Sequence, residues 1–216
     1  MDAVQCGHFR TGRFQSYQRI LENAGAQVSN LRAAKTEASR GLDSRAPAEF
    51  LPDGISMAKS LGGGFPIGAA WIRQPYADLL GPGTHGTTFG GTPLGCAVAL
   101  KILEVIREEK LDTNVRELGE FLKAELLRLK AKYPTVITAV RGLGFMIGIE
   151  LAEKIPALNQ EGKAISMQMV NRLHAAGLMT IPSGNQVIRL LPPLNLSCSQ
   201  ADEGLTLIES VVRKLA

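Results

Sequence analysis

Lys59 stands in a segment whose composition suits covalent chemistry with an aldehyde. It lies in Ser-Met-Ala-Lys-Ser (residues 56–60), and the turn sequence Leu-Gly-Gly-Gly-Phe-Pro follows directly. Small and apolar neighbours favour partial desolvation of the amine, which prepares it to react with a carbonyl. A lysine before a glycine turn is also a common solvated surface residue, so Lys59 alone leaves both interpretations open. A phosphate-binding P-loop is disfavoured, because there the glycines precede the lysine.

A second segment, His-Gly-Thr-Thr-Phe-Gly-Gly (residues 85–91), has the composition of a phosphate site. Thr87 and Thr88 supply two hydroxyls, and the glycines leave backbone amides open at the start of a predicted helix. Thr92 is a suitable N-cap for that helix, and Pro93 suits its first position. The alternative is a simple capped turn that binds no ligand.

Three further polar residues have spacings or surroundings that fit a binding site. Asp2 and Gln5 stand three residues apart, which can place a carboxylate beside an amide at the end of a strand. Arg189 lies in the apolar stretch Val-Ile-Arg-Leu-Leu-Pro-Pro (residues 187–193). Because arginine is rarely buried without a partner, it either forms a structural ion pair or binds a carboxylate with its planar fork.

The composition argues against several other classes of site and partner. The chain has 216 residues, of which 45% are hydrophobic, and a formal charge of +4. Its basic residues are scattered, so a nucleic-acid surface is not predicted. The three cysteines are widely spaced and the three histidines lack metal-ligand spacing, so neither disulfides nor a metal is expected. With no apolar stretch near eighteen residues, we expect a cytoplasmic protein without a membrane partner.

In the first half of the chain, the elements form around the glycine turns. Residues 23–50 are polar, small and of mixed charge, which predicts a surface insertion or mobile loop. Residues 67–72 read as a short buried strand. Residues 97–107 read as a helix buried over much of its circumference, because apolar side chains occur on several of its faces.

The second half of the chain predicts a separate α+β unit. Leu118, Leu122, Leu126 and Leu129 share one face of a helix over residues 113–132. From residue 136 onward the periodicity gives the order β-β-α-β-β-α, with strands at 136–140, 144–151, 178–181 and 187–191, and the last helix opening with Ser199 and Asp202 in capping-box spacing. We therefore predict an α/β domain over residues 1–110 and a small α+β domain over 111–216.

Four motifs taken together carry a resemblance. In chain order they are Asp-x-x-Gln-x-Gly-x-x-Arg-Thr-Gly from residue 2, Ala-Lys-Ser-Leu-Gly-Gly-Gly-Phe-Pro-Ile-Gly-Ala from 58, His-Gly-Thr-Thr-Phe-Gly-Gly-x-Pro-Leu from 85, and Val-Arg-Gly-Leu-Gly from 140. This set resembles the class III aminotransferases, and within that family the acetylornithine and ornithine aminotransferases. The resemblance implies a fold-type-I α/β architecture, with part of the large-domain sheet in residues 1–110, and the cofactor pyridoxal 5′-phosphate.

The resemblance also implies roles for residues near the cofactor. Lys59 would carry the cofactor as a Schiff base and then shuttle a proton during the reaction. Asp2 would pair with the protonated pyridine nitrogen, and Gln5 would donate a hydrogen bond to the phenolic oxygen. In this family the Thr88 position, together with Thr87, binds the phosphate of the neighbouring subunit, which implies a homodimer.

For the substrate, the resemblance implies that Arg189 binds a carboxylate. The reaction would transfer an amino group from a donor such as N-acetylornithine or ornithine to 2-oxoglutarate. Two alternatives stay open: a non-catalytic remnant that binds an intact aminotransferase subunit, and a related enzyme acting on GABA or another ω-amine, or an aminomutase.

The sequence departs from the family in its length and at two positions. Family members carry an N-terminal half that precedes the Asp2 motif, so we expect a truncated chain with an unpaired sheet edge. Ala3 stands where the family commonly has glutamate, and Thr92 where it commonly has asparagine. These departures weaken the expectation of full activity more than that of common descent.

Overall fold

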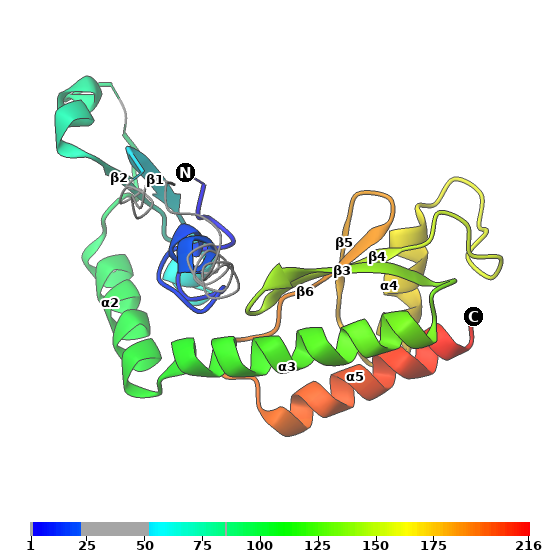
Figure 1. Cartoon of the computed structure of the whole chain (residues 1–216). Coiled ribbons are helices and arrows are strands. Elements are labelled where there is room, and N and C mark those ends of the chain that lie inside the picture. The colour runs from blue at the N-terminus through cyan, green and yellow to red at the C-terminus, as the bar shows by residue number, and fades with distance from the viewer. Residues whose placement is uncertain (1, 23–51, 85) are drawn as a thin grey trace, which may run out of the picture. The chain divides into compact units, whose positions relative to one another are not determined.

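The polypeptide is organised in two compact units. The computed structural model describes residues 2–22, 52–84 and 86–216, so the insertion predicted at 23–50 lies outside the described residues. Unit 1 contains Met1–Phe9 and Arg13–Glu109, and unit 2 contains Arg10–Gly12 and Lys110–Ala216. Figure 1 shows the helices and strands of both units along the chain.

Unit 1 is built around a short two-stranded sheet. Strands β1 (Gly54–Met57) and β2 (Ala69–Ile72) pair antiparallel, with Ser56 opposite Ala70. The 3₁₀ helix η1 (Lys59–Leu61) follows β1, and a second one, η2 (Gln74–Leu80), follows β2. Helix α2 (Pro93–Glu108) closes the unit, and Thr92 caps it as predicted, its Oγ1 accepting a hydrogen bond from the Gly95 amide at 3.3 Å.

Two burial predictions for unit 1 were wrong. The strand predicted at 67–72 starts at Ala69 and is largely exposed, because among the described residues it pairs with β1 alone. Helix α2 was predicted to be buried on several sides, but only Gly95, Ala99 and Ile106 are buried. Its Leu100 is 69% exposed. Apolar residues therefore occur on faces of this unit that nothing in the described chain covers.

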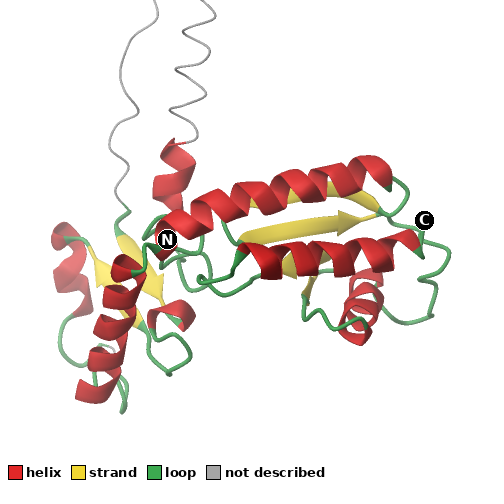
Figure 2. Ribbon diagram, turned by 90° about the horizontal axis from the view of Figure 1, so that it is seen from below, coloured by secondary structure: helices red, strands yellow, loops and turns green. Residues whose placement is uncertain are grey.

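Unit 2 has the predicted β-β-α-β-β-α order after its first helix. Its sheet has the antiparallel order β3-β4-β6-β5. The elements in chain order are α3 (Leu111–Lys132), β3 (Ile137–Leu143), β4 (Met146–Leu151), α4 (Ile165–Ala175), β5 (Ile181–Ser183), β6 (Val187–Leu190) and α5 (Cys198–Arg213). Figures 1 and 2 show α3 and α5 side by side across the sheet.

The core of unit 2 forms where these helices meet the sheet. The four leucines predicted on one face of α3 are all buried, which confirms that helix and its inward face. Alternate residues of β4, including Ile147 and Ile149, point to the same core, as expected for a strand with one covered face. Ile208 and Val212 of α5 complete it.

Several element boundaries in unit 2 differ from the predictions, and two of the differences have a clear physical reason. The last helix starts two residues early, because the capping box consists of Ser197 and Gln200, each side chain bonding the other's backbone N–H. The strand predicted at 178–181 begins only at Ile181, since the Leu178 amide still donates to Leu173 O at 2.9 Å, at the end of α4. Among the described residues, no helix is both long and apolar enough to cross a bilayer.

Candidate active site

Lys59 lies at the end of β1, where the strand becomes a turn. It is the first residue of η1, and the amide of Gly62 donates to its carbonyl at 3.1 Å. Its backbone φ is +50°, in the left-handed region that side-chain-bearing residues seldom occupy. Such a conformation is retained where neighbouring structure imposes it, and it is common at functional sites.

Of the two interpretations left open for Lys59, the described chain shows the solvated one. The residue is exposed, and within residues 2–22, 52–84 and 86–216 no hydrogen bond or ion pair of its ammonium is found. Its neighbour Ser60 differs, since its hydroxyl is buried without a hydrogen-bond partner among those residues. Of η1, Leu61 alone is buried. The turn therefore fixes the backbone of Lys59 and leaves the amine open to solvent.

Asp2 is held beside this strand. It forms a parallel β-bridge with Ser56, and the adjacent Ala3 amide donates to the Ser56 carbonyl at 2.9 Å. Its carboxylate Oδ1 accepts the Val4 amide at 2.9 Å, which orients the side chain. Ser56 is three residues before Lys59, so unit 1 brings Asp2 close to the chain segment that carries the lysine. Gln5, partly buried, lies in the turn that follows Asp2.

The turn that carries Asp2 and Gln5 is packed against β1. Gln15 is buried, and its Nε2 donates to the Met57 sulfur at 3.5 Å. The Cys6 sulfur of the turn lies 3.1 Å from the hydroxyl of Ser16, in the helical segment that follows. The carboxylate and amide predicted to face a cofactor therefore stand on a turn supported by the strand that leads to Lys59.

The segment with Thr87 and Thr88 leads into the start of α2 in the same unit. Both threonines are exposed, and the Gly90 amide donates to the Thr87 carbonyl at 3.3 Å to close a turn. At the first turn of α2, a Cβ on Gly95 would stand 3.4 Å from the Phe65 ring. Because Phe65 belongs to the glycine turn after Lys59, that turn and the helix N-terminus adjoin each other.

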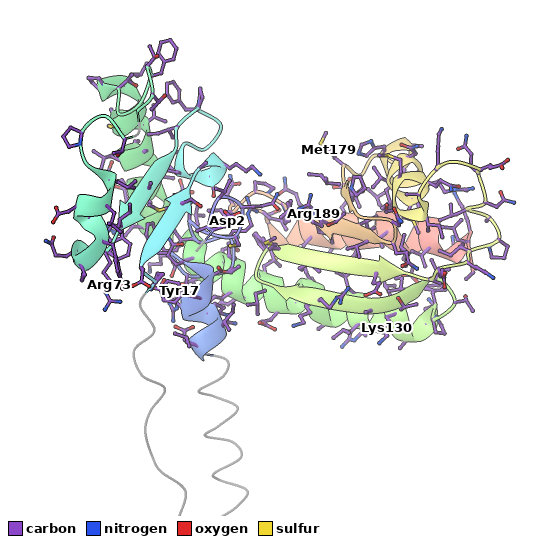
Figure 3. All side chains as sticks on the ribbon, turned by 90° about the horizontal axis from the view of Figure 1, so that it is seen from above. Asp2, Tyr17, Arg73, Lys130, Met179 and Arg189 are labelled. Atoms are coloured by element: carbon purple, nitrogen blue, oxygen red, sulfur yellow. The ribbon has the colours of Figure 1, made fainter. Side chains whose placement is uncertain are left out.

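Arg189 lies in unit 2, whereas the other five predicted residues belong to unit 1. It sits within β6, opposite Gly148 of β4 and Ile181 of β5, and is partly buried (Figure 3). The structure thus groups Asp2, Gln5, Lys59, Thr87 and Thr88 on unit 1 and places Arg189 on the sheet of unit 2.

Two features of the site were missed at the level of sequence. Arg10, three residues before Arg13, hydrogen-bonds the Pro192 carbonyl, just beyond the strand of Arg189. The Ser60 hydroxyl is buried beside Lys59. Both residues stand in the quoted motifs, but no role was predicted for either, because the Arg10 contact and the burial of the Ser60 hydroxyl depend on tertiary structure. Within the described ranges, no group of three or more His, Cys, Asp or Glu could hold a metal.

Comparisons with known proteins agree with the geometry. A family model described as "Aminotransferase class-III" matches residues 44–212. Acetylornithine aminotransferase of Clostridium acetobutylicum is 34% identical over 213 residues, 98% of this chain and 45% of that protein. Succinylornithine transaminase of Photorhabdus laumondii is 39% identical over 163 residues, 76% of this chain and 39% of that protein.

Solved structures give the same result. An ornithine aminotransferase from Plasmodium yoelii matches with a TM-score of 0.77 and 26% identity, over 100% of this chain and 47% of that one. The Toxoplasma gondii ornithine aminotransferase, with partial occupancy of PLP at its active site, matches with a TM-score of 0.74, 28% identity and 99% and 42% coverage. The chain therefore spans under half the length of the relatives it matches.

Proposed function

Because this chain belongs to the class III aminotransferases, a family of pyridoxal-phosphate-dependent enzymes, we propose that it takes part in amino-group transfer from an acetylornithine- or ornithine-type donor to 2-oxoglutarate. The observation that carries the proposal is the bridge between Asp2 and Ser56, three residues before Lys59. This backbone contact places the motif that contains Asp2 beside the motif that contains Lys59, within unit 1. Succinylornithine is a further candidate donor, since a matching relative is a succinylornithine transaminase.

The residues of unit 1 fit pyridoxal phosphate by the chemistry of their groups. The cofactor aldehyde would react with an amine, and Lys59 offers one on an ordered turn. The protonated pyridine nitrogen would pair with a carboxylate, and Asp2 offers one that is already oriented. Gln5 offers an amide for the phenolic oxygen. The phosphate would be held by Thr87, Thr88 and the amides at the start of α2, where the helix dipole favours an anion. When bound, the cofactor supplies an electron sink for the substrate's α- or ω-carbon electrons.

The chain's own groups then perform three tasks. The Lys59 amine would act as general base, accepting the proton from the substrate carbon, and then as general acid, giving that proton back. The Asp2 carboxylate stabilises positive charge on the ring nitrogen. Arg189 binds the substrate carboxylate, for which two parallel N–H donors are better suited than a lysine ammonium.

We assign the phosphate role of Thr87 and Thr88 to a neighbouring copy of the chain, so that the working form is a homodimer. The support is the apolar character around these threonines: Phe89 is 84% exposed and Leu94 is 64% exposed. Side chains of this size are expected to be covered in an assembled protein. A second copy would also exclude water from the Lys59 amine, which the described chain leaves open.

Each unit then has its own proposed role. Residues 1–110 would be the C-terminal part of the cofactor-binding domain, and residues 111–216 the small domain that carries Arg189. The three cysteines are free in the described chain, which is consistent with a reaction in the reducing cytoplasm.

A second candidate is a non-catalytic subunit that binds an intact aminotransferase. It is favoured by the exposure of Lys59 and by the few buried apolar residues of unit 1. The two candidates differ in whether the purified chain itself turns over N-acetylornithine and 2-oxoglutarate.

Titration with pyridoxal phosphate tests the proposal. The wild type should develop the visible absorbance of a lysine-bound aldehyde and lose it when N-acetylornithine is added. Lys59→Ala should abolish both signals. Lys101→Ala, which removes an exposed lysine of α2 that pairs with Glu104 at 2.8 Å, is the matched control and should keep them. An equal spectrum in wild type and Lys59→Ala would exclude Lys59 from the chemistry, and a band without turnover would favour the non-catalytic subunit.

A further inference from the structure

The three-residue segment 10–12 is docked on unit 2, although the residues on both sides belong to unit 1. The Phe145 amide donates to the Arg10 carbonyl at 2.9 Å, and Arg116 Nη1 donates to the Gly12 carbonyl at 3.0 Å. A Cβ on Gly144 would stand 2.8 Å from the Arg10 carbonyl oxygen. The backbone of the segment is therefore fixed against the β3–β4 turn and the first turns of α3.

The Arg10 side chain extends from this fixed backbone to the end of β6. Its Nη1 donates a hydrogen bond to the Pro192 carbonyl, and β6 ends at Leu190, one residue beyond Arg189. Among the described residues, no carboxylate forms an ion pair with Arg10. Burial lowers the pKa of the Arg10 guanidinium from its ordinary value. A cation that is partly removed from water and bonds a carbonyl makes a strong, directional contact.

The loop after β6 is held at a second point further along. Asn114 Nδ2 donates to the carbonyls of Leu194 and Leu196 at 2.9 and 3.0 Å. Arg10 therefore holds the near end of the loop, next to the strand of Arg189, and Asn114 holds the far end. Asn114 provides a control for Arg10, because its contacts are with the same loop but lie further along the chain from Arg189.

We propose that Arg10 is a positioning residue for substrate recognition: by holding the Pro192 carbonyl, it fixes the end of β6 so that Arg189 is aligned to bind a carboxylate. The inference rests on the carboxylate role proposed for Arg189. Small displacements of a substrate-binding group weaken binding and orientation strongly.

The test compares two amines that differ only in the carboxylate. N-acetyl-L-ornithine and N-acetyl-1,4-diaminobutane are titrated against the cofactor-loaded protein, and the loss of visible absorbance gives a half-saturating concentration and a limiting rate. In Arg10→Ala we expect the half-saturating concentration of N-acetylornithine to rise about tenfold, equivalent to ~1.4 kcal/mol. The limiting rate and the values for N-acetyl-1,4-diaminobutane should stay near wild type.

Three variants control the interpretation. Arg10→Lys keeps a donor for the Pro192 carbonyl and should recover part of the loss. Asn114→Ala loosens only the far end of the loop and should shift the half-saturating concentration much less. Arg13→Ala removes a nearby positive charge, which pairs with Glu22 at 2.6 Å at the surface of unit 1, and should have no effect on recognition.

Amide hydrogen exchange provides a readout without substrate. In Arg10→Ala the amides of residues 187–191 should exchange faster, while the Phe145 amide, which bonds the backbone of residue 10, should stay protected. Deprotection of Phe145 as well would mean that the segment has detached, and it would overturn the positioning role. So would equal losses for both amines or unchanged exchange in β6. If the wild type shows no visible band, the proposed function fails, and exchange alone decides whether Arg10 fixes β6.

Discussion

Units 1 and 2 differ in how much apolar surface they bury and in how many of the proposed site residues they contain. Unit 2 has a continuous core in which both long helices pack against a four-stranded sheet. In the described part of unit 1, the buried apolar residues are Ala3, Leu61, Ala99 and Ile106, and large side chains such as Leu79 and Phe89 are exposed. Yet five of the six proposed site residues lie in unit 1. The unit with the self-sufficient core holds the arginine proposed to bind substrate, and the unit with the exposed apolar surface holds the amine proposed to react.

This difference indicates where each unit obtains its stability. Hydrophobic burial is the main favourable term in folding, and unit 2 obtains it from its own residues. The exposed apolar residues of unit 1 become stabilising only when another surface covers them. Substitutions in matched positions of the two units can therefore test the comparison.

The largest effect is expected in the core of unit 2. Leu126, fully buried on α3, should cost about 2–5 kcal/mol of unfolding free energy when replaced by alanine, because a cavity remains. Leu100→Ala on α2 removes a side chain that is 69% exposed and should change stability by about 0.5 kcal/mol or less. Urea unfolding followed by circular dichroism measures both. Similar losses would show that α2 is packed as tightly as α3.

A smaller loss is expected at the turn where segment 10–12 meets unit 2. Gly144 has φ +53°, and an added Cβ would lie 2.8 Å from both the Arg10 oxygen and Val115 Cγ1. Gly144→Ala should destabilise unit 2 by about 2–4 kcal/mol, from the left-handed backbone and overpacking together.

Gly184→Ala is the matched control for that substitution. Its φ is +63°, but nothing lies within 4 Å of an added Cβ, so only the backbone cost of about 1 kcal/mol should appear. Equal losses for the two alanines would mean that the packing of Gly144 against Arg10 contributes nothing.

The helix caps should give an effect of about 1 kcal/mol. Ser197→Ala breaks the capping box of α5 and should lower the unfolding free energy by that amount. Thr92→Ala removes the cap of α2 in unit 1 and should reduce the affinity for pyridoxal phosphate more than it changes the overall urea midpoint. A fall in midpoint for Thr92→Ala as large as that for Ser197→Ala would contradict the difference between the units.

The last comparison is a pH dependence confined to unit 1. His8 is fully buried against Phe14, and burial lowers its pKa below the usual 6.5. Above pH 6.5 the imidazole is neutral in both folded and unfolded chains. As the pH falls below 6.5, the unfolded chain takes up a proton that the folded chain resists, so unit 1 loses stability until the folded pKa is reached.

Trp71, the single tryptophan, lies on β2 and reports on unit 1. Its fluorescence transition in urea should move to lower concentration between pH 7 and pH 5, and His8→Phe should remove that movement. A shift that persists in His8→Phe would assign the effect to another group.

The sequence predicted unit 2 better than unit 1 for a physical reason. The spacing of Leu118, Leu122, Leu126 and Leu129 predicts the buried face of α3 correctly, because the core of unit 2 covers that one face. In unit 1, the apolar residues of α2 and of residues 67–72 predict buried elements. Most of these side chains are exposed instead, because no other element among the described residues packs over them.

For the site, the resemblance carried by the motifs proposes Lys59, Asp2 and the threonine pair, but it does not show which residues support them. The contact of Asp2 with Ser56 joins residues 54 positions apart in the numbering (56 minus 2), and that of Arg10 with Pro192 spans 182. No local pattern encodes such pairs, because they follow from the tertiary arrangement of strands.

The most direct test of the account is to locate the bound cofactor chemically. The protein is incubated with pyridoxal phosphate and reduced with borohydride, and the labelled residue is identified by peptide mass spectrometry. We predict one label per chain, on Lys59, and its loss in Lys59→Ala. A label spread over several surface lysines, or an unmodified Lys59 beside a labelled lysine elsewhere, would contradict the assignment of the catalytic amine to unit 1.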